Sequence, residues 1–197
     1  IAGAAAPLSA AIRKAATGWG AESAEPGAHA LAAGLRFPPP SAAFVNAFQI
    51  HCQEFDCVHE PAVVHPMATV FSACLAEAEQ QGGVTGAALI AAVIVGVDVA
   101  TGLGVAARSP IRFFRPATAG IFGATLAVAR LRGLTVAQAE NALGHALAHA
   151  SGTMQAHLEG TPALPVQIAN AARASLVACD LAAAGVSGPH DVFEGPV

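Results

Sequence analysis

Apolar residues along this chain fall in segments of helical length and almost never alternate with polar residues as they would in a half-buried strand. The most apolar segment, 86–107, carries a single charge at Asp98, and further helix-length segments cover 66–82 and 165–185. No stretch shows sustained period-two alternation or an Asn-Gly hairpin signal, and the β-branched residues lie inside Ala-rich segments. The pattern predicts an all-α fold, a large helical bundle with no sheet of consequence.

Capping residues and prolines mark the expected helix ends in the first half of the chain. Pro38-Pro39-Pro40 predicts an extended connector, and Ser41 directly after it is a candidate N-cap. Pro66 is suited to open the next helix, which should end at Gly82-Gly83. Thr85 should then precede the long apolar helix.

The same signals recur in the second half. Pro116 stands where a first-turn proline belongs, and Gly133 where a C-terminal glycine belongs. The residues from Thr135 to Gln138 have the sequence of a capping box, which would open a helix carrying His145 and His149. A last helix is expected over 165–185.

The segment from Gly86 to Ala107 is long enough to cross a bilayer. Its glycines at 96, 102 and 104 and its many alanines also allow neighbouring helices to approach closely, and the flanking helices are amphipathic and carry acidic residues. We therefore expect a buried core helix of a soluble bundle and no membrane partner.

Composition places the chain in one domain or part of one. It has 197 residues, of which 54% are hydrophobic, and a mean hydropathy of +0.55, which leaves no room for extensive disorder. The net charge of −4, with only nine Lys plus Arg, argues against a nucleic-acid partner. The first residues of the sequence resemble the middle of a helix and include no N-cap residue, so we expect the natural protein to be longer.

The four cysteines, Cys52, Cys57, Cys74 and Cys179, form no CxxC pair and no compact disulfide spacing. The chain also lacks a basic start followed by an apolar stretch and a cleavage site. These features favour reduced thiols in a cytoplasmic protein.

Titratable residues are concentrated between His51 and Pro66, in a chain that is only 11% charged. This segment reads HCQEFDCVHEPAVVHP and contains His59 and His65 as well as Glu54 and Asp56. Such groups are costly to desolvate unless they are paired or used, so their clustering in an Ala/Val-rich surround favours a functional site. The alternative is a solvated loop after a helix end, which collects polar residues anyway.

His145 and His149 lie one helical turn apart, which is a spacing that metal ligands use. The zincin motif is not met, because no Glu follows the first histidine. Core or interface histidines explain the pair better, so we predict no metal site.

Several motifs in order resemble the MmgE/PrpD family. They are the His51–Pro66 segment, FFRPATAGIFGA at Phe113–Ala124, ALGHALAHASGTM at Ala142–Met154, IANAAR at Ile168–Arg173 and GVSGPHDVFEG at Gly185–Gly195. The family includes 2-methylcitrate dehydratase, cis-aconitate decarboxylase and iminodisuccinate epimerase. The resemblance implies that residues 1–197 form part of a large helical domain that makes homodimers, and that the natural protein continues into a smaller α/β lid domain that this chain lacks.

Carried over residue by residue, the resemblance places the family's acidic motif on Glu54, Asp56 and Cys57. The proposed catalytic histidine of its His-Pro pair falls on His65, with Pro66 retained. The aspartate at the key position is therefore a glutamate here, and the third acid of the motif is a cysteine.

Other positions depart from the family pattern. A second family histidine falls on Arg115, and a family lysine and histidine fall on Leu164 and Gln167. Arginine stays protonated, so Arg115 would clamp a carboxylate rather than move a proton. His149 falls where the family has a glutamine near the substrate pocket and is a candidate to replace the lost imidazole, and Gln155 lies in the loop that the family uses near its site.

The resemblance implies a lyase or epimerase, most simply of the 2-methylcitrate dehydratase type, acting on a small di- or tricarboxylic acid without a cofactor. His65 would exchange a proton next to a carboxylate, with help from Glu54 and Asp56, because an imidazole titrates near neutrality. Arg115 and Arg112 would hold carboxylates, with His149, Gln155 and Gln167 as further substrate contacts. The alternative is a non-catalytic binding or assembly subunit, which Leu164 and Gln167 favour.

Overall fold

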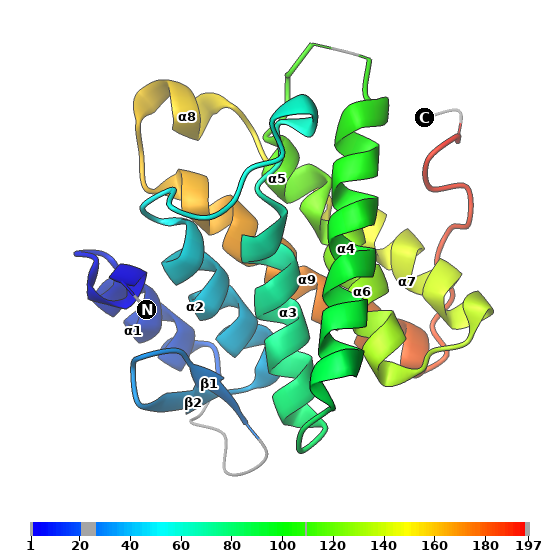
Figure 1. The fold of residues 1–197 in the computed structure, drawn as a ribbon, viewed down its shortest axis with the longest axis horizontal. Coiled ribbons are helices and arrows are strands. Elements are labelled where there is room, and N and C mark those ends of the chain that lie inside the picture. The colour runs from blue at the N-terminus through cyan, green and yellow to red at the C-terminus, as the bar shows by residue number, and fades with distance from the viewer. Residues whose placement is uncertain (1, 21–26, 109, 196–197) are drawn as a thin grey trace.

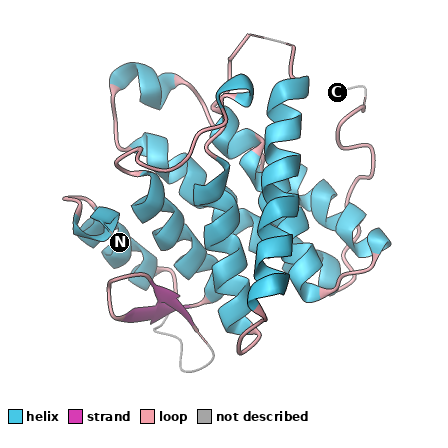
Figure 2. Ribbon diagram, in the orientation of Figure 1, coloured by secondary structure: helices cyan, strands magenta, loops and turns pink. Residues whose placement is uncertain are grey.

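The computed structural model describes residues 2–20, 27–108 and 110–195, and this part of the chain is mostly helical, as predicted (Figure 2). The helices are α1 (Ser9–Gly18), α2 (Pro39–His51), α3 (Pro66–Gln80), α4 (Gly86–Ala106), α5 (Arg115–Thr118), α6 (Gly120–Arg132), α7 (Val136–His149), α8 (Gln155–Glu159) and α9 (Ala163–Ala183), with short 3-10 helices at Ala2–Ala5 and Glu60–Ala62. One antiparallel hairpin joins β1 (Ala28–Ala30) to β2 (Leu35–Phe37), with His29 opposite Arg36. Strands of three residues do not change the fold class.

The centre of the molecule is formed by α2, α3, α6 and α9, which pack against one another (Figure 1). Helix α4 covers α3 and α6, α7 covers α6 and α9, and α1 with the hairpin covers α2. Phe48, Ile121, Ile168 and Leu176 are among the largest fully buried side chains of this core. Most of the remaining core is alanine and valine, which lets the helix axes approach closely.

Most expected helix ends are confirmed. Helix α3 begins at Pro66, and the Thr85 hydroxyl accepts a hydrogen bond from the Ala88 N–H at the start of α4. The capping box is complete, since Thr135 and Gln138 each bind the other's backbone N–H. Gly133 ends α6 with a left-handed φ of 66°.

The expected start of α2 is wrong. Pro39 and Pro40 lie in its first turn, Pro38 is the N-cap, and Ser41 lies inside the helix and is buried. The first-turn N–H groups of a helix have no partner within the helix, so prolines lose nothing there and their fixed φ suits the helix. The proline run therefore opens a helix where an extended connector was expected.

The expectation that α4 is a buried core helix is also wrong. Its buried residues are Ala92, Gly96, Ala100 and Gly104, spaced every four positions, whereas Ile90 and Ile94 are more than 60% exposed. A Cβ added to Gly96 would collide with Val70 and with the backbone of α6. Helix α4 is thus held in place by close backbone contacts along this stripe of small residues. By length and composition alone α4 could also cross a membrane, and the expected absence of a membrane partner stays a prediction.

Candidate functional site

The segment that connects α2 to α3 brings two histidines together. His51 is the last residue of α2, and His65 directly precedes Pro66 at the start of α3. Because α2 and α3 pack side by side, the end of one helix lies beside the start of the other. The two imidazole rings meet edge to face, with their centroids 4.9 Å apart.

The carboxylate of Asp56 lies between these two rings. Its Oδ1 and Oδ2 lie 3.1 and 3.2 Å from Nδ1 of His51, and Oδ1 lies 3.6 Å from Nδ1 of His65. The first contact is a hydrogen bond in which His51 donates, while the second is an electrostatic contact slightly too long for one. The Asp56 and His51 side chains are only 3% and 1% exposed, against 21% for His65, so the open end of this cluster is His65.

The cluster shifts the protonation of its members in opposite directions. Burial disfavours the ionised form of Asp56, but the contacts with His51 and His65 outweigh burial and hold the pKa of this carboxyl well below its usual range. The Asp56 carboxylate, with a smaller contribution from the charge of Glu54, raises the pKa of His65 above its ordinary value although burial opposes this. Asp56 is therefore an anion near neutral pH, and its charge favours the protonated form of His65.

His51 is the site residue that sequence reasoning did not assign. It was counted in the cluster without a role, although it stands five positions before Asp56 at the end of an apolar helix. Its Nε2 atom is buried with no hydrogen-bond partner among the described residues, and its ring lies 6.2 Å from that of Phe114. A buried imidazole nitrogen without a partner is costly, and this makes His51 a candidate member of the site.

The loop between the histidines is held in a strained shape. Glu54 and Val63 adopt left-handed φ angles of 53° and 54°, which are uncommon for residues other than glycine and especially for a β-branched one. The loop rests on α4, where a Cβ added to Gly104 would collide with Ala62 and Val64. The small-residue stripe of α4 thus positions the segment that leads into His65.

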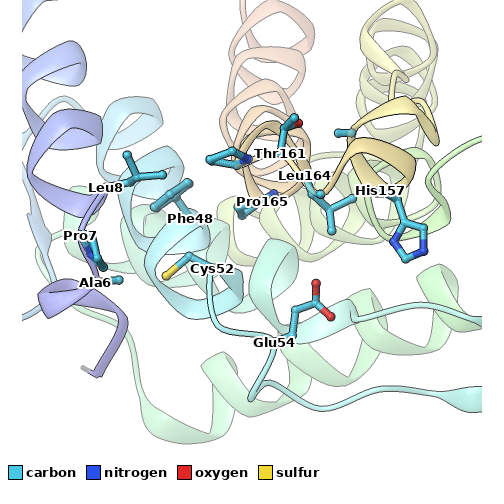
Figure 3. Close-up of a pocket in the computed structure, with 13 residues that line it drawn as sticks. Ala6, Pro7, Leu8, Phe48, Cys52, Glu54, His157, Thr161, Leu164 and Pro165 are labelled. Atoms are coloured by element: carbon cyan, nitrogen blue, oxygen red, sulfur yellow. The ribbon is translucent and has the colours of Figure 1, made fainter.

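Glu54 lies in the same loop but faces a separate cavity of about 390 Å³. Figure 3 shows its carboxylate pointing into the space bounded by Cys52, Phe48 and Leu164. Its charge makes a small contribution to the raised pKa of His65. The structure therefore groups Asp56 and His65 directly and Glu54 beside them.

Arg115 approaches this loop from the opposite side. Its Nη1 donates to the carbonyls of Ala62 and Gly104 at 3.3 and 3.4 Å, and its half-buried side chain lines a smaller cavity with Phe122 and Phe193. These contacts fasten the loop to α4. The role of Arg115 as a carboxylate clamp stays a prediction, as does that of Arg112, which is exposed in the segment before α5.

Two of the other predicted substrate contacts, Gln167 and Gln155, have described hydrogen-bond partners. Gln167 exchanges hydrogen bonds with the backbone N–H and carbonyl of Thr153. Gln155 donates to Glu159 within α8, and His149 lines an exposed cavity at the end of α7 with Arg173. Their contacts with substrate remain predictions.

His51, Asp56 and His65 are also the kinds of residue that bind metal ions. Their candidate ligand atoms are spread over distances of up to 4.8 Å. Two ligands at about 2.1 Å from one zinc ion lie at most about 4.2 Å apart, so this arrangement would have to contract to hold one. The geometry corresponds to two imidazoles organised by one carboxylate.

Known proteins share this sequence pattern. The model of the MmgE/PrpD N-terminal domain matches residues 1–197. Human and mouse cis-aconitate decarboxylase are 33% and 31% identical to the chain over 167 residues, which cover 81% of the chain. A cis-aconitate decarboxylase-like protein of Aspergillus oryzae is 32% identical over 169 residues.

The matched region is only 34–35% of the length of these relatives. The chain therefore corresponds to about a third of the length of such a protein. Since the family match extends over every residue of the sequence, the chain belongs to the MmgE/PrpD family as its N-terminal domain.

Proposed function

We propose that this chain is the helical domain of a lyase or epimerase that acts on a small di- or tricarboxylic acid by removing a proton next to a carboxylate. The observation that carries this proposal is the Asp56 carboxylate, which is buried between two imidazoles of which only His65 is open to solvent. An acid-base pair of this kind is suited to proton transfer near neutral pH. Dehydration of the 2-methylcitrate type and epimerisation both begin from such a step, whereas a decarboxylation releases CO2 and needs a proton at the corresponding carbon, which protonated His65 would supply.

In this mechanism His65 is the general base. Asp56 faces Nδ1 of His65 and leaves Nε2 available to take a proton from the carbon next to the substrate carboxylate. The electron pair of that C–H bond stays on the substrate as an enolate, and the new positive charge on the imidazole is stabilised by Asp56 and Glu54. Arg115 or Arg112, together with parts of the protein outside this chain, would hold the carboxylates and the enolate.

The relatives support the reaction class. Two of them are named cis-aconitate decarboxylase, whose named substrate is an unsaturated tricarboxylate. We also propose that the full-length protein adds a lid domain, forms a homodimer and works in the cytoplasm. The exposed apolar side chains Ile90 and Ile94 on α4 and Val136 on α7 agree with a further contact surface of this kind.

The test is solvent exchange at the reacting carbon. The full-length protein is incubated in deuterated buffer with a panel of small di- and tricarboxylates, and loss of the proton signal is followed by NMR. We expect exchange of at least one acid, reduced on the order of 10² to 10⁴-fold by His65→Gln. The matched control is His190→Gln, an exposed histidine that contacts Asn141, which should leave exchange unchanged. Exchange at the wild-type rate in His65→Gln would exclude this mechanism.

The second candidate function is a non-catalytic subunit that still binds acids. It is favoured by Gln167, which stands where the family has a histidine and is engaged with the Thr153 backbone. Binding of an acid by the wild-type protein without exchange of any of its protons would support this function instead.

A further inference from the structure

We propose that the cavity beside Glu54 holds an uncharged branched aliphatic arm of the substrate, so that the preferred acid is an alkyl-substituted dicarboxylate in place of a tricarboxylate. This inference rests on the proposed function, because it specifies the substrate class of the same site. It concerns a different group of residues from the histidine cluster and is tested by a separate measurement.

The walls of the cavity are mainly apolar. They come from the turn before α1, from α2, from α8 and from the start of α9, and the larger apolar side chains are Pro7, Leu8, Phe48, Leu164 and Pro165 (Figure 3). Phe48 is 1% exposed and Leu164 is 9% exposed, so both are fixed by packing. The volume of about 390 Å³ is in the range of small-molecule sites. Such a surface gains free energy by covering carbon atoms.

The charges around the cavity exclude a carboxylate. Its polar lining residues are Cys52, Glu54, His157 and Thr161, and none of the described lining residues is a lysine or arginine. A carboxylate that entered would lie against the carboxylate of Glu54 without a permanent cation to neutralise it. An uncharged arm has no such cost.

The cavity is placed to receive an arm of a molecule that reacts at His65. Glu54 forms part of its wall and stands two positions before Asp56, whose carboxylate lies 3.6 Å from Nδ1 of His65. Cys52 and Glu54 belong to the loop that carries Asp56. A substrate whose reacting carbon faces His65 could therefore extend one substituent past Glu54 toward Phe48 and Leu164.

Leu164 is the residue that decides the character of this cavity. It is the second residue of α9, and its side chain forms part of the wall near Glu54 (Figure 3). A lysine at this position would bring an ammonium group to the cavity and neutralise the effect of Glu54. The sequence resemblance identifies the same position as one where the family has a lysine, so the change from cation to hydrocarbon is a difference between this chain and that pattern.

The experiment compares isobutylsuccinate with tricarballylate. Both have a succinate core with a CH2-linked substituent, which ends in an isopropyl group in the first acid and in a carboxylate of similar size in the second. Binding of each to the full-length protein is measured by calorimetry. We expect the wild type to bind isobutylsuccinate at least tenfold more tightly. Leu164→Lys should reverse this preference, whereas the neutral control Leu164→Met, which conserves volume, should keep it.

Equal or tighter binding of tricarballylate by the wild type would overturn the inference, and so would binding of neither acid. If circular dichroism shows that Leu164→Lys does not fold, Glu54→Gln replaces it and should reduce the discrimination against tricarballylate at least severalfold. An unchanged ratio in a folded variant counts against the inference. Proton exchange on the same samples separates the two proposals: preference for isobutylsuccinate without exchange removes the proposed reaction alone, and exchange with preference for tricarballylate removes the cavity assignment alone.

Discussion

Helix α3 has a cluster of titratable groups at each end, and the two clusters differ in how their charges are paired. At the C-terminal end, the buried Glu77 lies 2.7 Å from Nη2 of Arg132, whose Nη1 lies 2.6 Å from Asp180. Gln81 donates a further hydrogen bond to Glu77. Burial opposes the charge of Arg132, but the carboxylates of Glu77 and Asp180 outweigh it and raise the pKa of the guanidinium.

At the N-terminal end, by contrast, one carboxylate serves two imidazoles. Nε2 of His51 has no partner among the described residues, and the contact of Asp56 with His65 is 3.6 Å long. The loop around it contains two left-handed residues that are not glycine. A structural ion pair requires each buried charge to have an opposite charge beside it, whereas a reactive site requires hydrogen-bonding capacity beside an open titratable group. The comparison teaches that pairing, more than burial, separates the two kinds of cluster.

The largest stability effect should come from breaking the paired cluster. Arg132→Met leaves the carboxylate of Glu77, which is 2% exposed, buried without its cation. We expect the free energy of unfolding to fall by about 3–5 kcal/mol, measured by urea denaturation. The double variant Arg132→Met with Glu77→Gln should recover part of this loss. His65→Gln, the matched change at the other end of α3, should cost much less, and an equal loss in both would contradict the comparison.

The contact between α4 and the site loop gives a smaller effect. Gly104→Ala places a Cβ against Ala62 and Val64, and such overpacking costs about 1–3 kcal/mol. Because Ala62 and Val64 lead into His65, catalytic turnover should fall as well. Gly102→Ala is the control: nothing lies within 4 Å of the added Cβ, so it should raise stability by about 0.5–1 kcal/mol. Thermal melting of both variants measures these changes in stability. If Gly104→Ala melts like the wild type, α4 does not support the loop.

The pH dependence tests the electrostatics of the open cluster. Since Asp56 raises the pKa of His65, the neutral base is lost as pH falls through this raised pKa, and Asp56→Asn should move the acid limb of the activity profile to lower pH.

The free energy of unfolding should also depend on whether His65 is protonated. The pair formed by Asp56 and protonated His65 stabilises the fold below the ordinary histidine pKa of about 6.5, and this contribution disappears as pH rises through the raised pKa. Asp56→Asn should remove this decline. Denaturation between pH 5 and 9 measures it, and identical profiles for both proteins would show that Asp56 does not control His65.

The smallest effect is expected at Arg115. Arg115→Lys keeps the charge but loses the planar fork that donates to Ala62 and Gly104, so stability should fall by about 0.5–1.5 kcal/mol. If Arg115 also binds a substrate carboxylate, the KM for the acid should rise in this variant, without any loss of stability beyond that expected from the two carbonyl contacts. A KM equal to that of the wild type would restrict Arg115 to its structural contacts.

The sequence predicted most helices because their ends are marked by local chemistry. A capping residue bonds only to groups within one helical turn of it. The structure confirms the helix ends that were predicted from Thr85, Thr135 and Gly133. The prediction failed at Pro39–Pro40, where one sequence suits both an extended segment and a helix start. It failed again for α4, because apolar composition does not state which face is covered, and only the neighbours α3 and α6 select the stripe of small residues.

At the candidate site, the sequence by itself determined which groups are available. They are the titratable residues between His51 and Pro66, including the His-Pro pair, and Leu164, which stands where the family resemblance places a lysine. Only the tertiary structure decided how they are used. The packing of α2 against α3 placed His51 beside His65 and buried Asp56 between them, while Glu54 turned toward the cavity formed by α2 and α9. The physical reason is that hydrogen bonding and pKa depend on distance and burial, which arise from contacts between segments that the order of residues does not state.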